Sequence, residues 1–433
     1  MIKSPNRKEP PAVKPFGKMS VPFENLSLLP NGITLHSFNG GDQPICKLSI
    51  AFQGGIREIG SEATANMVLS QIFEGAGNKT ASQIADILDY NGARIGMRSQ
   101  VHHSVLDVWM LNERASQILD LLKECISSPA YPQNELDTAK LRATAAFLSS
   151  REDVATLAGE ALTRLIYGEG HPLARPMSEE AIALVDRAGL TAAHGRLLVP
   201  ENTNVFLSGM IDGEVEMAVY DFLCELPSMG PSFKPVVEPI CPEEPGKKVY
   251  VGMEGALQDA IMAGLPAPGR DSEDYSLLRF TIMALGGYFG SRLMTNIRED
   301  KGLTYGISAS LLGNHEGSYM TIGAQCDGAY TERVIDEIYA EMRGLVSNPP
   351  KDDELRRLKL HAATNLAEIL DTPAGIMGYY ANRLFVGTPD DYFARQQAAI
   401  DTLTPQIISD MAEKYLRPDN LRIAICGDYD RRS

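Results

Sequence analysis

The sequence predicts an α+β protein built from two similar domains. Residues 128–141 and 347–360 lie 219 positions apart and share a proline-containing turn, an acidic residue followed by leucine, and a Lys-Leu pair. A second match lies near the end of each half, where 200–209 and 418–427 both read as a Pro-x-Asn turn, an apolar strand and a glycine. Between the halves, 226–247 is rich in proline and has no apolar periodicity. We therefore predict a duplicated domain and a linker.

The composition supports two domains of ordinary size. The chain has 433 residues, of which 44% are hydrophobic and 22% are charged, which is typical of a globular protein with more than one core. We predict an N-terminal arm at 1–20, a first domain at 21–227, a linker at 228–247 and a second domain at 248–433. Each domain should combine strands and a helical layer with a closing strand.

Charge and hydropathy restrict the classes of partner. The formal net charge of -16 disfavours nucleic acid and acidic membranes and favours neutral or basic ligands. No apolar run approaches membrane-spanning length, and residues 1–19 lack the apolar core of a secretory signal. The six cysteines are scattered and include no C-x-x-C pair, which is typical of a reducing compartment. We predict a cytoplasmic protein without nucleic-acid or membrane partners.

The first domain begins with helical patterns that can be placed closely. Apolar residues recur at helical spacing over 62–73, and Gly75 and Gly77 should end that helix. A second helix is predicted over 83–90, because a polar cap precedes it and an Asn-Gly pair follows it. Alternating residues then predict one strand over roughly 94–111.

This order, with the stretch FEGAGNKTASQIADILDYNGARI, resembles the N-terminal half of the pitrilysin/insulinase (inverzincin) peptidases, the relatives of mitochondrial processing peptidase. Their helix carries H-x-x-E-H, in which two imidazoles one turn apart bind zinc and the glutamate is the general base. Alignment on residues 73–75 places Asn66 and Ser70 at the histidine positions and Leu69 at the glutamate. An amide, a hydroxyl and an isobutyl group cannot hold zinc, so these are degenerate metal positions.

The remaining candidate ligands are no better. The resemblance places the family's third ligand, a glutamate, in a window that holds Ala146 and Phe147. The chain has seven histidines, and no two stand four residues apart. His102 and His103 are adjacent on the predicted strand, so they should point to opposite faces and cannot bind one ion together. We expect no metal in this chain.

The second half carries the stronger match. A glycine-rich loop leads a helix that ends near Arg298, and a strand containing Tyr305 follows. This resembles the family's C-terminal signature, in which an arginine and a tyrosine seven residues apart serve the active site. The resemblance implies that Tyr305 donates to the developing oxyanion and Arg298 holds a substrate carbonyl. Apart from the resemblance, an arginine in the last turn of a helix and a tyrosine at the start of a strand are ordinary structural features.

The loop around Gly286 and Gly287 has several interpretations. Backbone amides at a helix start can bind phosphate, but this loop lacks both the G-K-[ST] ending of a P-loop and the G-x-G-x-x-G spacing. Close helix packing or contact with a peptide is favoured instead. We predict Gly286 and Gly287 as substrate-binding residues.

The resemblance implies two duplicated α/β sandwich domains, with antiparallel-rich sheets and helical layers, in a clamshell. The leading hypothesis is the non-metal subunit of a heterodimeric zinc metalloendopeptidase, inactive alone. Its partner would be a homologous chain that carries H-x-x-E-H and the zinc, and its substrate a peptide. The alternative is a catalytically inactive homologue that acts as a peptide-binding or assembly subunit, and a homodimer is compatible with either. An unrelated activity based on Ser70 has no recognisable histidine base in the sequence.

Overall fold

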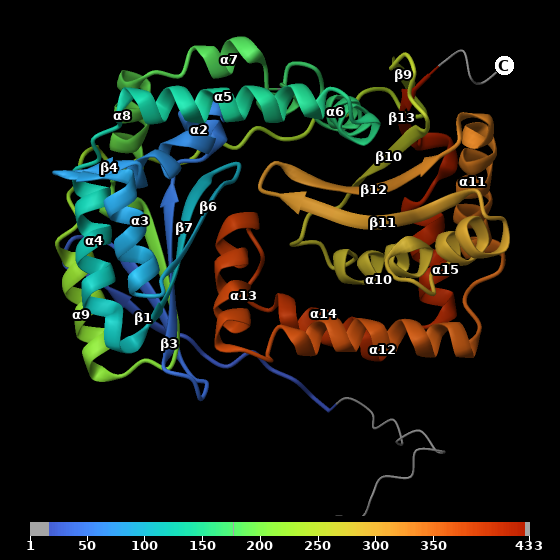
Figure 1. The fold of residues 1–433 in the computed structure, drawn as a ribbon. Helices are drawn as coiled ribbons and strands as arrows, with labels where there is room; N and C mark the ends of the chain where they lie inside the picture. The colour runs from blue at the N-terminus through green and yellow to red at the C-terminus, as the bar shows by residue number, and fades with distance from the viewer. Residues whose placement is uncertain (1–16, 176, 429–433) are drawn as a thin grey trace, which may run out of the picture.

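Two mixed sheets face each other, each backed by a layer of helices, in a clamshell-like arrangement (Figure 1). The computed structural model describes residues 17–175 and 177–428. The first sheet has the spatial order β1 (Asn25–Leu28), β2 (Thr34–Asn39), β8 (Thr203–Gly209), β3 (Ile45–Gln53), β7 (His103–Leu111) and β6 (Arg94–Ser99). The second has the order β11 (Thr304–Asn314), β12 (Gly317–Cys326), β10 (Asp259–Ala267), β13 (Arg422–Gly427) and β9 (Lys248–Gly252). A two-stranded ribbon joins β4 (Gly75–Ala76) to β5 (Lys79–Thr80).

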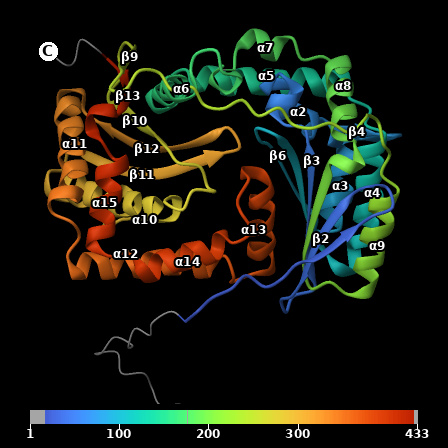
Figure 2. The ribbon, with the colours of Figure 1, turned by 180° about the vertical axis from the view of Figure 1, so that it is seen from behind.

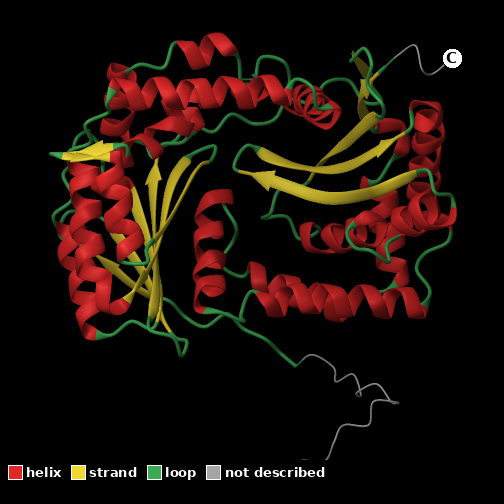
Figure 3. Cartoon of the chain, in the orientation of Figure 1, coloured by secondary structure: helices red, strands yellow, loops and turns green. Residues whose placement is uncertain are grey.

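Helices, with the loops that connect them, make up the rest of each half, as the cartoon in Figure 3 shows. Those of the first half are α1 (Ile56–Ile59), α2 (Glu62–Val68), α3 (Ala81–Tyr90), α4 (Ala115–Ser127), α5 (Gln133–Ser150), α6 (Val154–Tyr167), α7 (Glu179–Ala183), α8 (Arg187–Leu197) and α9 (Gly213–Cys224). Those of the second half are α10 (Tyr275–Gly286), a π-helix (Met294–Asp300), α11 (Thr331–Ser347), α12 (Asp352–Glu368), α13 (Pro373–Val386), α14 (Tyr392–Thr402) and α15 (Pro405–Tyr415). Short 3₁₀ turns lie at Ser70–Phe73, Asn112–Arg114, Pro172–Ala174, Pro200–Asn202, Gly328–Tyr330 and Pro418–Asn420.

The two sheets repeat one topology, as the duplication predicts. The order β6-β7-β3-β8-β2 in the first half matches β11-β12-β10-β13-β9 in the second. In both, the central strand pairs antiparallel with its two neighbours, and the only parallel pair among these strands is β2 with β8 or β9 with β13. The first sheet adds β1 at its edge. The α+β fold with two similar domains is therefore confirmed.

Each half covers the inner face of the other half's sheet with one helix. Helix α6 packs on β10 and β13 of the second sheet, where Leu162 and Ile166 belong to one buried apolar cluster with Ala424. Helix α13 packs on β2 and β8 of the first sheet, where Met377 belongs to one buried apolar cluster with Phe206. The two helices occupy equivalent positions 219 residues apart in the sequence. The outer face of the first sheet is covered by helices of its own half, including α3, α4 and α9 (Figure 2). Because α6 and α13 each pack on the sheet of the other half, they hold the two halves together. The predicted linker at 228–247 lies between the last strand of the first sheet and the first strand of the second.

A buried ionic cluster also joins the halves. His102, between β6 and β7, has its Nδ1 2.6 Å from Oε1 of Glu58 and its Nε2 3.1 Å from Oε1 of Glu316 in the β11–β12 turn. The other oxygen of Glu316 accepts a hydrogen bond from the backbone N–H of Glu238 in the linker. Burial alone lowers the pKa of His102, but the carboxylates of Glu58 and Glu316 outweigh it and raise that pKa above its ordinary value.

Two sequence predictions need correction. The single strand expected over 94–111 is a hairpin, β6 and β7, with His102 in its turn, because apolar alternation continues through a turn that contains neither glycine nor proline. The helix expected over 62–73 ends as an α-helix at Val68 and continues as a 3₁₀ turn. The next helix is confirmed as α3, whose capping box joins Thr80 and Gln83.

The described part of the N-terminal segment packs against the second half. The predicted arm at 1–20 lies outside the described residues except for 17–20, which run along α14, where the backbone N–H of Met19 donates to Gln397. Within the described residues, no helix combines the length and the apolar character needed to cross a bilayer. The cytoplasmic location stays a prediction.

Candidate functional site

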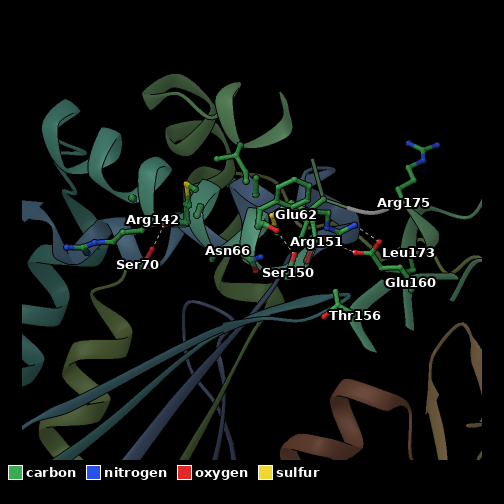
Figure 4. Close-up of a pocket in the computed structure, with 18 of the residues that line it drawn as sticks. Glu62, Asn66, Ser70, Arg142, Ser150, Arg151, Thr156, Glu160, Leu173 and Arg175 are labelled. Carbon is green, nitrogen blue, oxygen red and sulfur yellow. Dashed lines mark hydrogen bonds and ion pairs between the residues drawn. The ribbon is translucent and has the colours of Figure 1, made fainter. Parts of the chain in front are cut away.

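A pocket of about 660 Å³ lies at the degenerate metal positions, between α2, α5 and the start of α6 (Figure 4). Helix α2 begins at Ser61, whose hydroxyl accepts a hydrogen bond from the Thr64 N–H and so caps it. The pocket is lined by Glu62, Ala63, Asn66, Met67, Ser70, Gln71, Glu74, Ala139, Arg142, Ala143, Ala146, Phe147, Ser150, Arg151, Thr156, Glu160, Thr163, Leu173, Ala174, Arg175, Met177 and Ile182. Its position agrees with the alignment, since the residues at both histidine positions and at the third-ligand window lie in its wall.

The three aligned positions do not share one helical face. Asn66 is exposed on α2, whereas Ser70 belongs to the 3₁₀ turn, and its hydroxyl donates to the carbonyl of Met67 at 2.9 Å. Leu69 is buried in the apolar core of the first half and does not line the pocket. The helix therefore ends between the two histidine positions, and the glutamate position points into the core.

These residues do not fit a zinc ion. Zinc sites in proteins use thiolate, imidazole or carboxylate ligands, whereas the two histidine positions hold the amide of Asn66 and a hydroxyl that is already bonded within the chain. Ala146 and Phe147 line the wall without a donor atom in their side chains. Across 17–175 and 177–428, no three His, Cys, Asp or Glu side chains form a group suited to a metal. We therefore derive no metal-dependent step at this pocket.

The pocket contains polar groups that the sequence analysis missed. Arg151 and Glu160 form a two-pronged ion pair, in which Nη1 lies 2.9 Å from Oε2. Burial raises the pKa of Glu62, the charge of Glu160 raises it further, and the hydrogen bond from Asn66 opposes both. The Oε1 atom of Gln71 is buried without a hydrogen-bond partner. These groups come from separate segments of the chain, so no local spacing in the sequence could reveal them. No histidine lines the pocket to act as a base for Ser70.

Arg298 and Tyr305 lie together, but not in this pocket. The Nε of Arg298, in the π-helix, donates to the backbone carbonyl of Tyr305 at 3.0 Å, and its guanidinium lies 5.0 Å from the ring centroid of Phe289. Tyr305 is 92% exposed and lines a separate pocket of about 440 Å³. Both pockets reach the first turn of α6, since Thr156 lines one and Ala155 the other. The predicted catalytic roles of Arg298 and Tyr305 stay predictions.

The two loop glycines differ in access. Gly286 ends α10 and is buried, and a Cβ there would lie 2.7 Å from both the Cβ and the backbone N of Ala309 on β11. The missing side chain thus lets α10 pack closely on the sheet. Gly287 caps the same helix and is exposed. The geometry favours a packing role for Gly286, and the substrate-binding role of this loop stays a prediction.

Comparison with known proteins shows which family this chain resembles. Residues 185–360 match a family model described as the peptidase M16 inactive domain. This segment of the chain is therefore similar to the M16 peptidases. The crystal structure of a peptidase M16 inactive domain from Pseudomonas fluorescens has a TM-score of 0.83 at 22% identity, covering 94% of this chain and 98% of that one. The M16 resemblance seen in the sequence is therefore confirmed.

Two relatives show how far the sequence similarity extends. An uncharacterized zinc protease of Mycobacterium leprae is 23% identical over 279 residues, which are 63% of this chain and 62% of that protein. The non-peptidase homolog YmxG of Helicobacter pylori is 24% identical over 293 residues, which are 67% of this chain and 64% of that protein. The matches thus span less than two thirds of the length of these relatives.

Proposed function

We propose that this M16 homologue has no peptidase activity of its own and acts as a peptide-binding and assembly subunit. The observation that carries the proposal is the pocket at the degenerate metal positions. It keeps a volume of about 660 Å³ and a wall of mixed polar and apolar side chains, although Asn66, Leu69 and Ser70 cannot supply zinc-dependent hydrolysis. The similarity to the non-peptidase homolog YmxG of Helicobacter pylori supports the same conclusion.

Purified protein tests the absence of activity. Metal analysis should find no stoichiometric zinc, and fluorescein-labelled casein peptides should stay intact with or without a chelator. The same peptides should bind, as measured by fluorescence polarisation. Stoichiometric zinc together with chelator-sensitive cleavage would contradict the proposal.

A pair of matched variants tests the pocket. Ala146 lines it from α5, so Ala146→Trp should fill its mouth and weaken peptide binding. Leu141 lies on the same helix but faces solvent, so Leu141→Trp should leave binding unchanged. If both variants bind the peptides equally well, the pocket is not the peptide-binding site.

One observation favours a second candidate, the non-metal subunit of a heterodimeric zinc endopeptidase. The phenol of Tyr305 is almost fully exposed, and Arg298 is held beside it, outside the chain's own pocket. An exposed pair of this kind is accessible to the active site of a zinc-binding partner that carries H-x-x-E-H. In such a complex, Tyr305 would donate a hydrogen bond to the oxyanion and Arg298 would hold the substrate.

Co-purification from the native host, followed by mass spectrometry, tests this second candidate. If a homologous chain with H-x-x-E-H is recovered and the complex cleaves peptides, Tyr305→Phe should lower kcat by about 10² to 10³ without changing assembly. Tyr330→Phe, at another partly exposed tyrosine of the second half, is the matched control. If the complex with Tyr305→Phe is fully active, the catalytic role of Tyr305 is wrong and only the assembly role remains. If only a homodimer is recovered, the second candidate is likewise wrong.

A further inference from the structure

A cavity of about 700 Å³ is lined by residues of the second half alone. Its lining residues come mainly from α10, α12, α13, α14 and β11, whose arrangement Figure 1 shows. Three arginines line it: Arg270 precedes α10, Arg279 lies on α10 and Arg383 lies on α13. The lining includes one acidic residue, Glu368, and it is exposed. Three guanidinium groups at one cavity are a marked local excess of positive charge in a chain whose net charge is -16.

The three guanidinium groups are held mainly by neutral groups. Arg279 donates to the side-chain oxygen of Gln396 at 2.6 Å. The guanidinium of Arg270 lies 5.3 Å from the ring centroid of Tyr275 and 5.9 Å from that of Tyr392, and it makes one long hydrogen bond to a backbone carbonyl. Cation–π contacts of this kind position a guanidinium without cancelling its charge.

Of these three arginines, only Arg383 has an acidic partner among the described residues. It pairs with Asp390, whose side chain is 92% exposed. Because the carboxylate of Asp390 lies almost entirely in water, which screens its charge, the pair contributes little and Asp390 can leave at small cost. The positive charge of the cavity is therefore available to a ligand.

Three buried polar atoms at the cavity lack a hydrogen-bond partner. They are the Nε atoms of Arg270 and Arg383 and the hydroxyl oxygen of Thr388. Thr388 is 8% exposed, so water does not reach its hydroxyl freely. Buried polar groups are nearly always paired in folded proteins, and an unpaired one is costly. Two N–H donors and a hydroxyl at one cavity match a ligand rich in acceptor oxygens.

The remaining wall suits an organic ligand rather than a bare ion. Tyr379, Tyr392 and Leu366 contribute aromatic and apolar surface. Gly378, on the cavity side of α13, would meet no atom within 4 Å if it carried a Cβ. The space next to this helix is therefore open, and its volume is typical of sites for small molecules.

We propose that this cavity binds a small organic oxyanion, a phosphate or a carboxylate, gripped by Arg270, Arg279 and Arg383. The planar fork of a guanidinium matches the paired oxygens of either group. The hydroxyl of Thr388 supplies a further hydrogen bond. Because α13 also covers the first sheet, the ligand contacts a helix that links the two halves.

Calorimetric titration of the full chain tests the proposal, with pyrophosphate as the phosphate probe and citrate as the carboxylate probe at constant ionic strength. At least one should bind saturably, with a Kd of roughly 1 mM or tighter. The tighter probe identifies the preferred chemistry. If neither probe saturates, the proposal is wrong.

Two variants and one control locate the binding. Arg270→Gln should weaken binding about 10- to 100-fold, because one charge-assisted contact is lost. Gly378→Leu should abolish it by filling the open space, and the helix should tolerate leucine better than glycine. Arg356→Gln removes an exposed arginine of α12 that pairs with Asp353, so it should bind as the wild type does. Equal weakening by Arg356→Gln, or unchanged binding by both cavity variants, would overturn the site.

Discussion

Replacing Glu316 by glutamine should loosen the contact between the two halves, and more strongly at low pH than at high pH. The carboxylate of Glu316 accepts two hydrogen bonds, one from Nε2 of His102 and one from the backbone N–H of Glu238. A glutamine has one oxygen, so its amide group must face one of these two donors. The side chain is fully buried, so water does not replace the lost bond.

The size of the destabilisation by Glu316→Gln follows from the contacts of His102. A hydrogen bond to a charged group contributes about 1.5–3 kcal/mol, and removing one partner of a buried ion pair costs about 3–5 kcal/mol. Because His102 keeps its bond to Glu58, we expect a loss of about 2–4 kcal/mol in the free energy of unfolding while the imidazole is charged.

The sign of the pH dependence follows from the raised pKa of His102. A raised pKa in the folded state stabilises the protein fully below the unfolded value of about 6.5, and this contribution is lost as pH rises through the folded value. The pKa of Glu58 is lowered by its bonds to His102 and to the N–H of Gly55 despite burial, so that carboxylate stays ionised near neutral pH. His103 is neutral there, because burial lowers its pKa to about 4. The cluster therefore weakens as pH rises.

Urea denaturation of the wild type and Glu316→Gln, at about pH 6 and about pH 9, measures the difference. Glu225→Gln is the control, because Glu225 forms an exposed pair with Lys123 and should change stability by less than about 0.5 kcal/mol. An equal loss at both pH values would show that His102 is not charged in the folded protein and would refute the reasoning.

Three further predictions follow from other parts of the structure. Gly286→Ala should destabilise by about 1–3 kcal/mol in thermal unfolding, because its Cβ would collide with β11, whereas Gly159→Ala, which meets open space inside α6, should be neutral or stabilising. The pKa of His103 is depressed to about 4 in the folded protein, so the imidazole contributes to the free energy of unfolding fully above about pH 6.5. Below that pH this contribution is lost, by up to about 3 kcal/mol, which denaturant unfolding at about pH 7 and about pH 4 would measure. The double variant Asn66→His, Ser70→His should not retain zinc by metal analysis, because the α-helix ends between the two positions and the third-ligand window holds Ala146 and Phe147. Stoichiometric zinc would contradict this prediction.

Local chemistry made part of this protein predictable from its sequence. The capping box at Thr80 and the positive φ of Gly92 follow from side-chain types that satisfy helix ends and allow left-handed backbone. The unsuitability of Asn66 and Ser70 for zinc follows from their donor atoms, wherever they lie. The repeated topology was expected because a duplicated sequence repeats its pattern of apolar residues, and that pattern selects which faces are buried.

The tertiary structure decided which distant segments meet. An apolar stripe shows that α6 and α13 must be covered, but it does not show that each packs on the other half's sheet. Likewise, the cluster of His102, Glu58 and Glu316 and the arginine-lined cavity combine residues that are far apart in the sequence. The sequence by itself determined the two similar domains and a pocket without zinc ligands, because local backbone preferences and ligand chemistry belong to individual residues. Only the tertiary structure decided how the halves are joined and where charges converge, because packing and electrostatics depend on distances in space.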